Sequence, residues 1–176
     1  FNKNVDIHKD ICECGDYKRS RIFLWVKLMI IFKPNNNFKV VGFDFFNAKN
    51  KNVSFKYKID KKVQAWHDSA TIDPKVLIKV CEGWGFKKLK LYPGDVRKTT
   101  KKYVKENFGS RISLLYLDVD NYDGTLAILK NLYPKMSKGG IIVLDEYGFK
   151  GHGESDAIDK FFKNKKVKLK SFSLEL

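Results

Sequence analysis

The sequence predicts an α/β fold built on a doubly wound, mostly parallel sheet. Strand-like and helix-like segments alternate along the 176 residues, an order typical of parallel strands joined by right-handed helical crossovers. Residues 112–117 and 141–144 are nearly continuous apolar runs, as expected for strands buried on both faces of a sheet. A chain of this length can form one domain with a sizeable core, so we expect a single domain over residues 1–176.

The first three elements are a strand, a helix and a second strand. Residues 10–14 are the first expected strand. Residues 18–32 have helical length and end before Pro34, which is a stop signal for a helix. The run Lys-Val-Val-Gly-Phe at 39–43 is the second expected strand, and Asp44 follows it directly.

A polar stretch separates this strand from the next helix. Residues 48–62 are rich in lysine and asparagine and are predicted to form a loop. Asp73 and Pro74 predict the start of a helix that runs to about residue 81, because Asp is a good N-cap and Pro fits the first turn. Residues 88–91 are a short third strand, and a helix is expected over residues 99–108.

The last third of the chain contains two buried strands. Residues 112–117 are the fourth strand, and the helix predicted over residues 124–133 is stopped by Pro134. The remaining expected elements are a fifth strand at 141–144, a helix at 154–164 and an alternating edge strand at 167–174.

The composition indicates a globular protein with a strong basic charge. Hydrophobic residues make up 43% of the chain and charged residues 31%, which argues against disorder, and the formal net charge is +15. Charges of this size also occur in proteins that bind nucleic acids. However, lysines spread along the chain supply most of it, and the four arginines are few for the bidentate contacts that phosphate and guanine recognition favours. We therefore do not expect a nucleic-acid partner.

Cysteine usage and hydropathy indicate a reducing cytoplasm. The cysteines at 12, 14 and 81 are odd in number and lack a second paired motif, so we expect reduced thiols rather than a zinc site. No secretory signal is recognisable, and the apolar run 22–32 is too short to span a bilayer, so no membrane partner is expected. The chain begins at Phe1 rather than Met, which indicates processing or a fragment.

Two of the buried strands end in pairs of acidic residues. Asp118 and Asp120 follow the fourth strand, and Asp145 and Glu146 follow the fifth. Ligands bind beyond the carboxyl ends of the strands in an open α/β sheet, and neighbouring ends would bring these four carboxylates together. Such a group needs a cation or a shared proton, which predicts a hard-metal site and an acid or base residue. The alternative is a set of solvated acids at strand-end turns.

The other strand ends have residues typical of a nucleotide-like cofactor site. The first strand ends in Glu13-Cys14-Gly15, and an acid and a glycine at such a strand-to-helix turn suit this kind of cofactor. Asp44 follows the second strand, where an acid commonly binds ribose hydroxyls, although it also suits a simple turn. Gly94 and Asp95 follow the third strand, where the acid either meets an adenine edge or caps the next helix.

Several stretches together resemble one family of enzymes. They are Glu13-Cys14-Gly15, Gly42-Phe43-Asp44-Phe45-Phe46, Gly94-Asp95-Val96 with Thr99, Leu117-Asp118-Val119-Asp120-Asn121-Tyr122 with Thr125, residues 131–140, and Asp145-Glu146-Tyr147-Gly148. The chain resembles the macrocin O-methyltransferase (TylF-like) family of Mg-dependent class I S-adenosylmethionine methyltransferases, which act on sugar hydroxyls of natural products. The resemblance covers most of the chain, is densest from residue 113 to 148, and implies a Rossmann-like class I methyltransferase fold.

The resemblance implies a role for each strand-end residue. Asp118, Asp145 and Glu146 fall where the family holds Mg²⁺. Asp120 falls at the general base that takes the proton of a sugar hydroxyl. The residues implied to bind S-adenosyl-L-methionine are Glu13, Gly15, Tyr17, Ser20, Asp44, Phe45, Gly94, Asp95 and Asp118. The chemistry agrees, because Mg²⁺ prefers carboxylate and water oxygens and lowers the pKa of a hydroxyl bound to it.

The chain departs from the family pattern in three places. Arg19 stands where the family turn has a further glycine, and Glu146 replaces the more usual Asp. Both ends are short, as in a truncated domain, which leaves substrate recognition incomplete or supplied by another subunit of a homo-oligomer. Two alternatives stay open: a catechol-type O-methyltransferase with the same metal chemistry, and a degenerate, non-catalytic methyltransferase fold that serves as a binding module.

Overall fold

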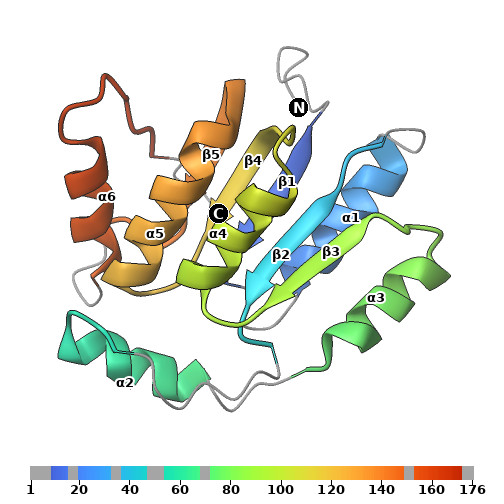
Figure 1. Cartoon of the computed structure of the whole chain (residues 1–176), viewed down its shortest axis with the longest axis horizontal. Helices are drawn as coiled ribbons and strands as arrows, with labels where there is room; N and C mark the ends of the chain where they lie inside the picture. The colour runs from blue at the N-terminus through green and yellow to red at the C-terminus, as the bar shows by residue number, and fades with distance from the viewer. Residues whose placement is uncertain are drawn as a thin grey trace.

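Five parallel strands form one sheet in the order β3-β2-β1-β4-β5 (Figure 1). The computed structural model describes residues 9–15, 20–32, 37–46, 54–67, 72–148 and 153–171. The strands are β1 (Asp10–Cys14), β2 (Val40–Asp44), β3 (Leu89–Pro93), β4 (Ile112–Leu117) and β5 (Met136–Leu144). Each neighbouring pair of strands is parallel. The α/β class and the parallel sheet predicted from the sequence are therefore confirmed.

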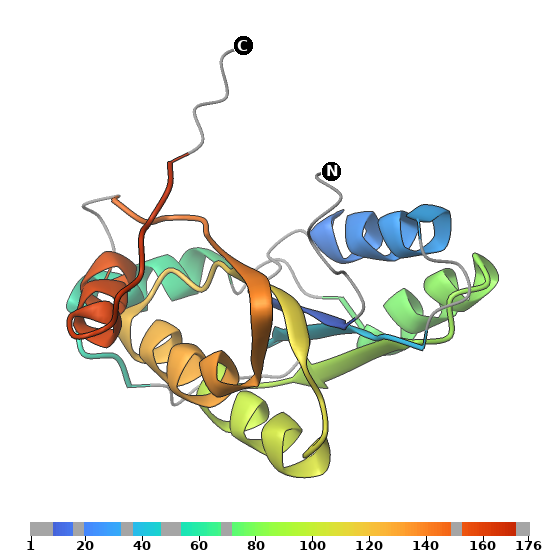
Figure 2. The ribbon, with the colours of Figure 1, turned by 90° about the horizontal axis from the view of Figure 1, so that it is seen from above.

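Helices cover both faces of this sheet (Figure 2). They are α1 (Ser20–Phe32), α2 (Lys58–His67), α3 (Pro74–Gly83), α4 (Val96–Glu106), α5 (Tyr122–Leu132) and α6 (Glu154–Phe162), with a short 3-10 helix at Tyr133–Lys135. Helices α1 and α3 lie on one face, α4 and α5 lie on the other, and α6 packs beside α5. This is the doubly wound arrangement that the alternation of strand-like and helix-like segments predicts.

Two apolar clusters fill the space between the sheet and its helices. The central strand β1 is buried along its whole length, and its side chains alternate between the two faces. Cys12 and Cys14 belong to the cluster under α4 and α5, whereas Ile11 belongs to the cluster under α1 and α3. The three cysteines are free, as predicted, and all of them are buried. No described helix has both the length and the hydropathy needed to cross a membrane.

The prediction of a loop over residues 48–62 is wrong at its C-terminal end, because residues 58–62 begin α2. Contacts with distant parts of the chain hold this helix in place. The carboxylate of Asp60, only 1% exposed, accepts hydrogen bonds from the backbone N–H groups of Tyr122 (2.9 Å) and Gly153 (3.1 Å). Such contacts can stabilise a short helix for which the sequence gives a weak signal. They also place α2 beside the starts of α5 and α6.

Two helices begin earlier than predicted because of their caps. The side chain of Asn121 accepts a hydrogen bond from the Gly124 N–H at 2.7 Å, so α5 starts at Tyr122. In the same way, the Asp95 side chain caps α4, which starts at Val96. The predicted cap of α3 by Asp73 is confirmed, since its side chain accepts from the Lys75 N–H, although α3 itself extends to Gly83. Polar caps thus decide where three of the helices begin.

The last two predicted strands also differ from the structure. β5 begins at Met136 rather than Ile141, because Met136 already pairs with Ile112 before a bulge in the β4–β5 ladder. The edge strand predicted for residues 167–174 is wrong over residues 167–171, which form no strand. Its remaining residues lie outside the part of the chain that the structure describes.

Candidate functional site

The backbone ladder of the sheet continues one residue beyond the carboxyl ends of β4 and β5. The Asp118 N–H donates a hydrogen bond to the Cys14 carbonyl oxygen (2.9 Å), and the Asp145 N–H donates to the Leu117 carbonyl oxygen (3.1 Å). Gly15, Asp118 and Asp145 therefore follow three adjacent strand ends. The strand order reverses between β1 and β4, and this is where open α/β sheets bind ligands.

Arg21, in the first turn of α1, joins three of the residues predicted to bind the cofactor. Its Nε donates to Oε1 of Glu13 at 2.9 Å. Its Nη2 donates to Oδ2 of Asp118 and to the carbonyl oxygen of Gly15, the latter at 3.3 Å. The guanidinium also lies over the Tyr116 ring, with Cζ 4.6 Å from the ring centroid. The structure thus brings Glu13, Gly15 and Asp118 together and adds a cation that the sequence reasoning missed.

Asp118 lies in a buried and acidic environment. The pKa of its carboxyl group is raised to about 7, because burial, and after it the charges of Asp120 and Asp145, raise the pKa by more than Arg21 lowers it. For Arg21 itself, burial lowers the pKa, but Asp118 and the hydrogen-bonded Glu13 together raise it by more. Three of the four acids that follow β4 and β5, namely Asp118, Asp120 and Asp145, are therefore close enough to interact, and the place of Glu146 among them stays a prediction.

The three proposed metal ligands do not form a ready-made metal centre. Asp145 Oδ1 accepts a hydrogen bond from the Tyr116 hydroxyl, and Asp118 pairs with Arg21. Within the described residues, which include Asp118, Asp145 and Glu146, no three His, Cys, Asp or Glu side chains are arranged to hold a metal ion. Their carboxylate oxygens fit a hard cation in type. A metal at this position therefore requires Arg21 and Tyr116 to release their partners.

Asp120 lies in the turn between β4 and α5, and its backbone is left-handed, with φ = 54°. Asp tolerates this conformation better than most residues. Its backbone N–H donates to Oε2 of Glu154 at 3.2 Å. Burial, followed by the nearby Asp120 and Asp118, raises the pKa of Glu154 to about 8. Glu154 is the second site residue that the sequence reasoning missed.

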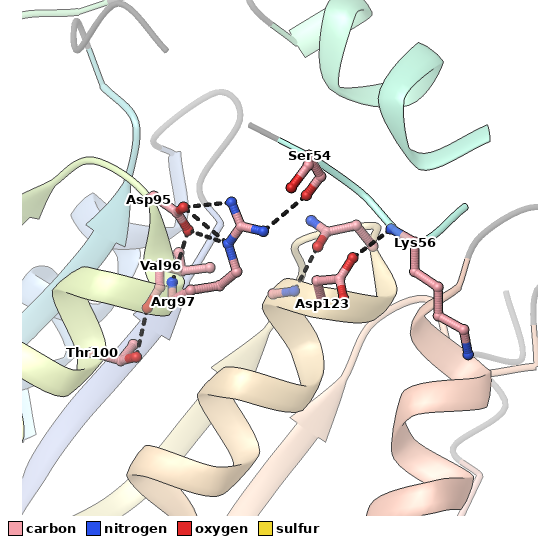
Figure 3. A network of polar contacts seen from close by, with 9 residues as sticks. Ser54, Lys56, Asp95, Val96, Arg97, Thr100 and Asp123 are labelled. Atoms are coloured by element: carbon pink, nitrogen blue, oxygen red, sulfur yellow. Dashed lines mark hydrogen bonds and ion pairs between the residues drawn. The ribbon is translucent and has the colours of Figure 1, made fainter. Parts of the chain in front are cut away.

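Asp95 serves as the cap of α4 (Figure 3). Its Oδ1 accepts a hydrogen bond from the backbone N–H of Arg97 at 2.9 Å, and the guanidinium of Arg97 pairs with the same carboxylate, with Nη2 and Oδ2 2.6 Å apart. Burial raises the pKa of Asp95, but its hydrogen bonds with Arg97 lower that pKa by more. This geometry matches the helix-cap alternative, and an adenine contact of Asp95 stays a prediction.

Asp44 and Gly94 shape turns at the ends of β2 and β3. The Asp44 carboxylate accepts a hydrogen bond from the Phe45 N–H, and the Gly94 N–H donates to the Asp44 carbonyl oxygen at 2.8 Å. Gly94 has φ = 122°, which favours glycine. Tyr17 and Arg19, together with the side chain of Ser20, lie outside what the structure describes. The proposed cofactor contacts of all these residues stay predictions.

The segment that precedes α2 is fastened to the starts of α4 and α5 (Figure 3). Arg97 Nη1 donates to the Ser54 carbonyl oxygen at 2.9 Å, and the Lys56 N–H donates to the Asp123 carboxylate at 2.6 Å. Together with the two hydrogen bonds to Asp60, these contacts hold residues 54–67 beside the turn that contains Asp120.

Comparison with known families agrees with the architecture and the strand-end residues. The profile of the macrocin O-methyltransferase (TylF) family matches residues 5–173. The chain belongs to this family. The resemblance seen in the sequence motifs is therefore confirmed. Comparison of the sequence with curated proteins gave no significant match.

Three of the solved structures similar to this macrocin O-methyltransferase family member are structures of methyltransferases. CalS11, a calicheamicin methyltransferase, is 27% identical with a TM-score of 0.72, over 89% of this chain and 65% of that chain. An apo structure of CalS11, described as a TDP-rhamnose 3'-O-methyltransferase, is 28% identical with a TM-score of 0.64, over 89% and 64%. The O-methyltransferase NovP, 20% identical with a TM-score of 0.73 over 90% and 64%, shows the fold alone. The chain thus spans less than two thirds of each of these proteins, and its fold is of the Rossmann-like methyltransferase class.

Arg21→Gln is expected to lower the free energy of unfolding by about 2 kcal/mol, because it removes the cation shared by two buried carboxylates. Unfolding in urea, without added cofactor or metal, measures this loss. Arg111→Gln is the matched control, since Arg111 is exposed and its guanidinium donates a hydrogen bond to the carbonyl oxygen of its neighbour Ser110. Equal losses in the two variants would show that the ion pairs of Arg21 contribute nothing to stability.

Proposed function

We propose that this protein is an S-adenosyl-L-methionine-dependent O-methyltransferase that methylates a hydroxyl of a sugar or sugar-containing metabolite. Membership of the macrocin O-methyltransferase family supports the reaction. The description of CalS11 as a TDP-rhamnose 3'-O-methyltransferase supports the class of acceptor. The observation that carries the proposal is the joining of Glu13, Gly15 and Asp118 at the point where the strand order reverses.

The proposed cofactor site follows the carboxyl ends of β1, β2, β3 and β4. S-adenosyl-L-methionine supplies an electrophilic methyl group when it is bound. Glu13 and Asp118 provide carboxylates for its amino-acid end, and Asp44 provides one for the ribose. At Gly15 an added Cβ would lie 1.6 Å from the Asp118 carbonyl oxygen, so glycine is what lets these two strand ends approach each other. The other proposed cofactor residues are Tyr17, Ser20, Phe45, Gly94 and Asp95.

We also propose that Asp118, Asp145 and Glu146 hold Mg²⁺. Carboxylate oxygens suit this ion, and Glu146 remains a hard oxygen ligand although it is longer than Asp. A bound Mg²⁺ orients an acceptor hydroxyl and lowers its pKa. Since Arg21 contacts Asp118 and Tyr116 contacts Asp145, the measured metal affinity includes the free energy needed to release both contacts.

Asp120 is the proposed general base. Its charge raises the pKa of Asp118, so the two carboxyl groups lie within interaction distance of each other. An acceptor hydroxyl held at the end of β4 can then give its proton to Asp120 as the oxygen becomes a nucleophile. The acids therefore have two roles: Asp118, Asp145 and Glu146 hold the metal, and Asp120 accepts the proton.

Titration calorimetry with S-adenosyl-L-homocysteine, with and without Mg²⁺, tests the proposal. We expect binding in both conditions, because most of the proposed cofactor contacts do not involve the metal. Asp145→Asn should leave the binding without Mg²⁺ unchanged and reduce only the response to Mg²⁺. If S-adenosyl-L-homocysteine binds neither with nor without Mg²⁺, the proposed enzyme function is refuted.

The ion pair between Arg21 and Asp118 favours a second candidate, a methyltransferase fold that binds a ligand without catalysis. In this candidate the guanidinium permanently occupies the carboxylate that the enzyme would use for its metal. Methyl transfer from radiolabelled S-adenosyl-L-methionine to a panel of sugar nucleotides, including TDP-rhamnose, separates the two. If the protein binds S-adenosyl-L-homocysteine but transfers no methyl group to any acceptor, and if Mg²⁺ has no effect on binding, the results favour the binding module.

A further inference from the structure

Glu154, the first residue of α6, is fully buried although it is an acid. Its Oε2 accepts the hydrogen bond from the Asp120 backbone N–H at 3.2 Å. Its other oxygen, Oε1, is buried without a hydrogen-bond partner among the described residues. Buried carboxyl groups are rare and costly unless they are paired. The hydrogen bonds of Glu154 with the backbone of Asp120 and of the neighbouring Val119 are therefore the features of this environment that can account for an acid here.

The turn that contains Asp120 is held from two sides. Asp120 has a left-handed backbone, which costs a non-glycine residue free energy and persists only where the surroundings enforce it. On one side, Asn121 fixes the turn by accepting from the Gly124 N–H and by donating from Nδ2 to the Val119 carbonyl oxygen at 2.5 Å. On the other side, Glu154 binds the Asp120 N–H.

The position of Glu154 is itself fixed by the start of α6. Gly153, the N-cap of α6, donates its N–H to Asp60, and the same carboxylate binds the Tyr122 N–H at the start of α5. An added Cβ at Gly153 would lie 2.6 Å from the ring of Tyr57 and 2.7 Å from the Cβ of Tyr122, so the two helix starts are packed directly against each other. Figure 1 shows α5 and α6 side by side. The packed starts of α5 and α6 therefore fix the position of Glu154 relative to Asp120.

We propose that Glu154 is a positioning residue that fixes Asp120 in the orientation needed to accept the acceptor's proton. This role rests on the proposed function, in which Asp120 is the general base. Glu154 acts through the backbone of Asp120 and does not itself touch the substrate.

The electrostatics of Glu154 agree with this role. Burial, then Asp120 and Asp118, raise the pKa of Glu154 to about 8, so at neutral pH its carboxyl group is largely protonated. A neutral acid accepts the backbone hydrogen bond without placing a second negative charge beside Asp120.

Two substitutions at Glu154 test the role. Glu154→Gln keeps an acceptor oxygen for the Asp120 N–H, whereas Glu154→Leu removes it at similar volume. We expect hydrogen exchange of the Asp120 amide, followed by NMR, to accelerate about tenfold in the Leu variant, as the loss of one hydrogen bond permits, and to change little in the Gln variant. Glu82→Leu, at an exposed position of α3, is the control for the substitution itself.

Methyl transfer to TDP-rhamnose, or to the first accepted sugar nucleotide of the panel, supplies the second measurement. Glu154→Leu should lower kcat about tenfold, in parallel with the lost hydrogen bond, and leave the KM for the acceptor and the affinity for S-adenosyl-L-homocysteine nearly unchanged. Glu154→Gln should restore most of kcat. In an Asp120→Asn background, Glu154→Leu should cause little further loss, because the two residues act through one group.

The possible failures are distinguishable. An unchanged Asp120 amide in Glu154→Leu would overturn the positioning role alone. If Glu154→Leu lowers kcat, the affinity for S-adenosyl-L-homocysteine and the thermal stability together, the positioning role is also overturned, because such a result shows a general structural role. Absence of S-adenosyl-L-homocysteine binding by the wild-type protein would instead overturn the proposed function on which the role rests.

Discussion

Gly15→Ala is expected to destabilise the protein by more than about 4 kcal/mol, among the largest effects of a single substitution. An added Cβ would lie 1.6 Å from the Asp118 carbonyl oxygen and 2.6 Å from its carbonyl carbon. Both are backbone atoms and cannot rotate away. Gly15 also has φ = 82°, where a side chain is strained even in open space. The Asp118 N–H already binds the Cys14 carbonyl oxygen, so the clash is relieved only by separating β1 from β4.

Urea unfolding followed by circular dichroism measures this loss, and calorimetry with S-adenosyl-L-homocysteine measures the loss of binding that we expect with it. Gly83→Ala is the matched control. Gly83 lies in α3, and an added Cβ there meets no described atom within 4 Å. Alanine favours a helix over glycine by up to about 1 kcal/mol, so this variant should be unchanged or slightly more stable. A Gly15→Ala protein as stable as Gly83→Ala would contradict the close approach of β1 and β4.

The strands were predictable where burial alone decides their residues. β1 and β4 lie at the predicted bounds. β4 is covered on both faces and is a nearly continuous apolar run that ends at Asp118, whereas β1 contains Asp10 and Glu13 and its end is marked by Gly15. β5 was predicted too short. Its first residues include the exposed Lys138 and Gly139, and only the pairing of Met136 with Ile112 reveals that they belong to the strand.

Helix α2 was not predictable for a related reason. Its sequence is rich in exposed lysines, which gives no clear apolar periodicity. The residue that anchors it, Asp60, has partners 62 and 93 positions away in the sequence, at Tyr122 and Gly153. From the sequence alone, an acid at this position is interpreted as a solvated side chain, because its distant partners are not known.

The candidate site shows the same division between local and distant signals. Glu13, Gly15 and Asp118 were found from the sequence because each follows or ends a strand, and the order of strands in an α/β sheet then brings the ends together. Arg21 was missed although Glu13, an acid near the end of a strand to which no cation was assigned, was a usable signal. Glu154 was missed because an acid in the first turn of a helix is normally explained by the helix dipole, and only its contact with Asp120 gives it another role.

Asp120→Asn is expected to lower the rate of methyl transfer about 10³-fold, within the range that general base catalysis contributes. The amide cannot accept the proton of the acceptor hydroxyl. Asn also tolerates the left-handed backbone that Asp120 adopts, and the hydrogen bond from its N–H to Glu154 does not involve the side chain. The turn should therefore keep its shape, and the affinity for S-adenosyl-L-homocysteine should be nearly unchanged. Single-turnover kinetics with radiolabelled cofactor, combined with calorimetry, measures both quantities.

Asp123→Asn provides the comparison at the start of the same helix. Asp123 accepts the Lys56 N–H on the outer side of the segment that precedes α2, and an Asn side chain keeps an oxygen for that bond, so rate and affinity should both stay close to wild type. If Asp120→Asn lowers both the rate of methyl transfer and the affinity for S-adenosyl-L-homocysteine, Asp120 supports the cofactor site instead of acting as a base. A small loss of rate, no larger than in Asp123→Asn, would assign the proton to another group.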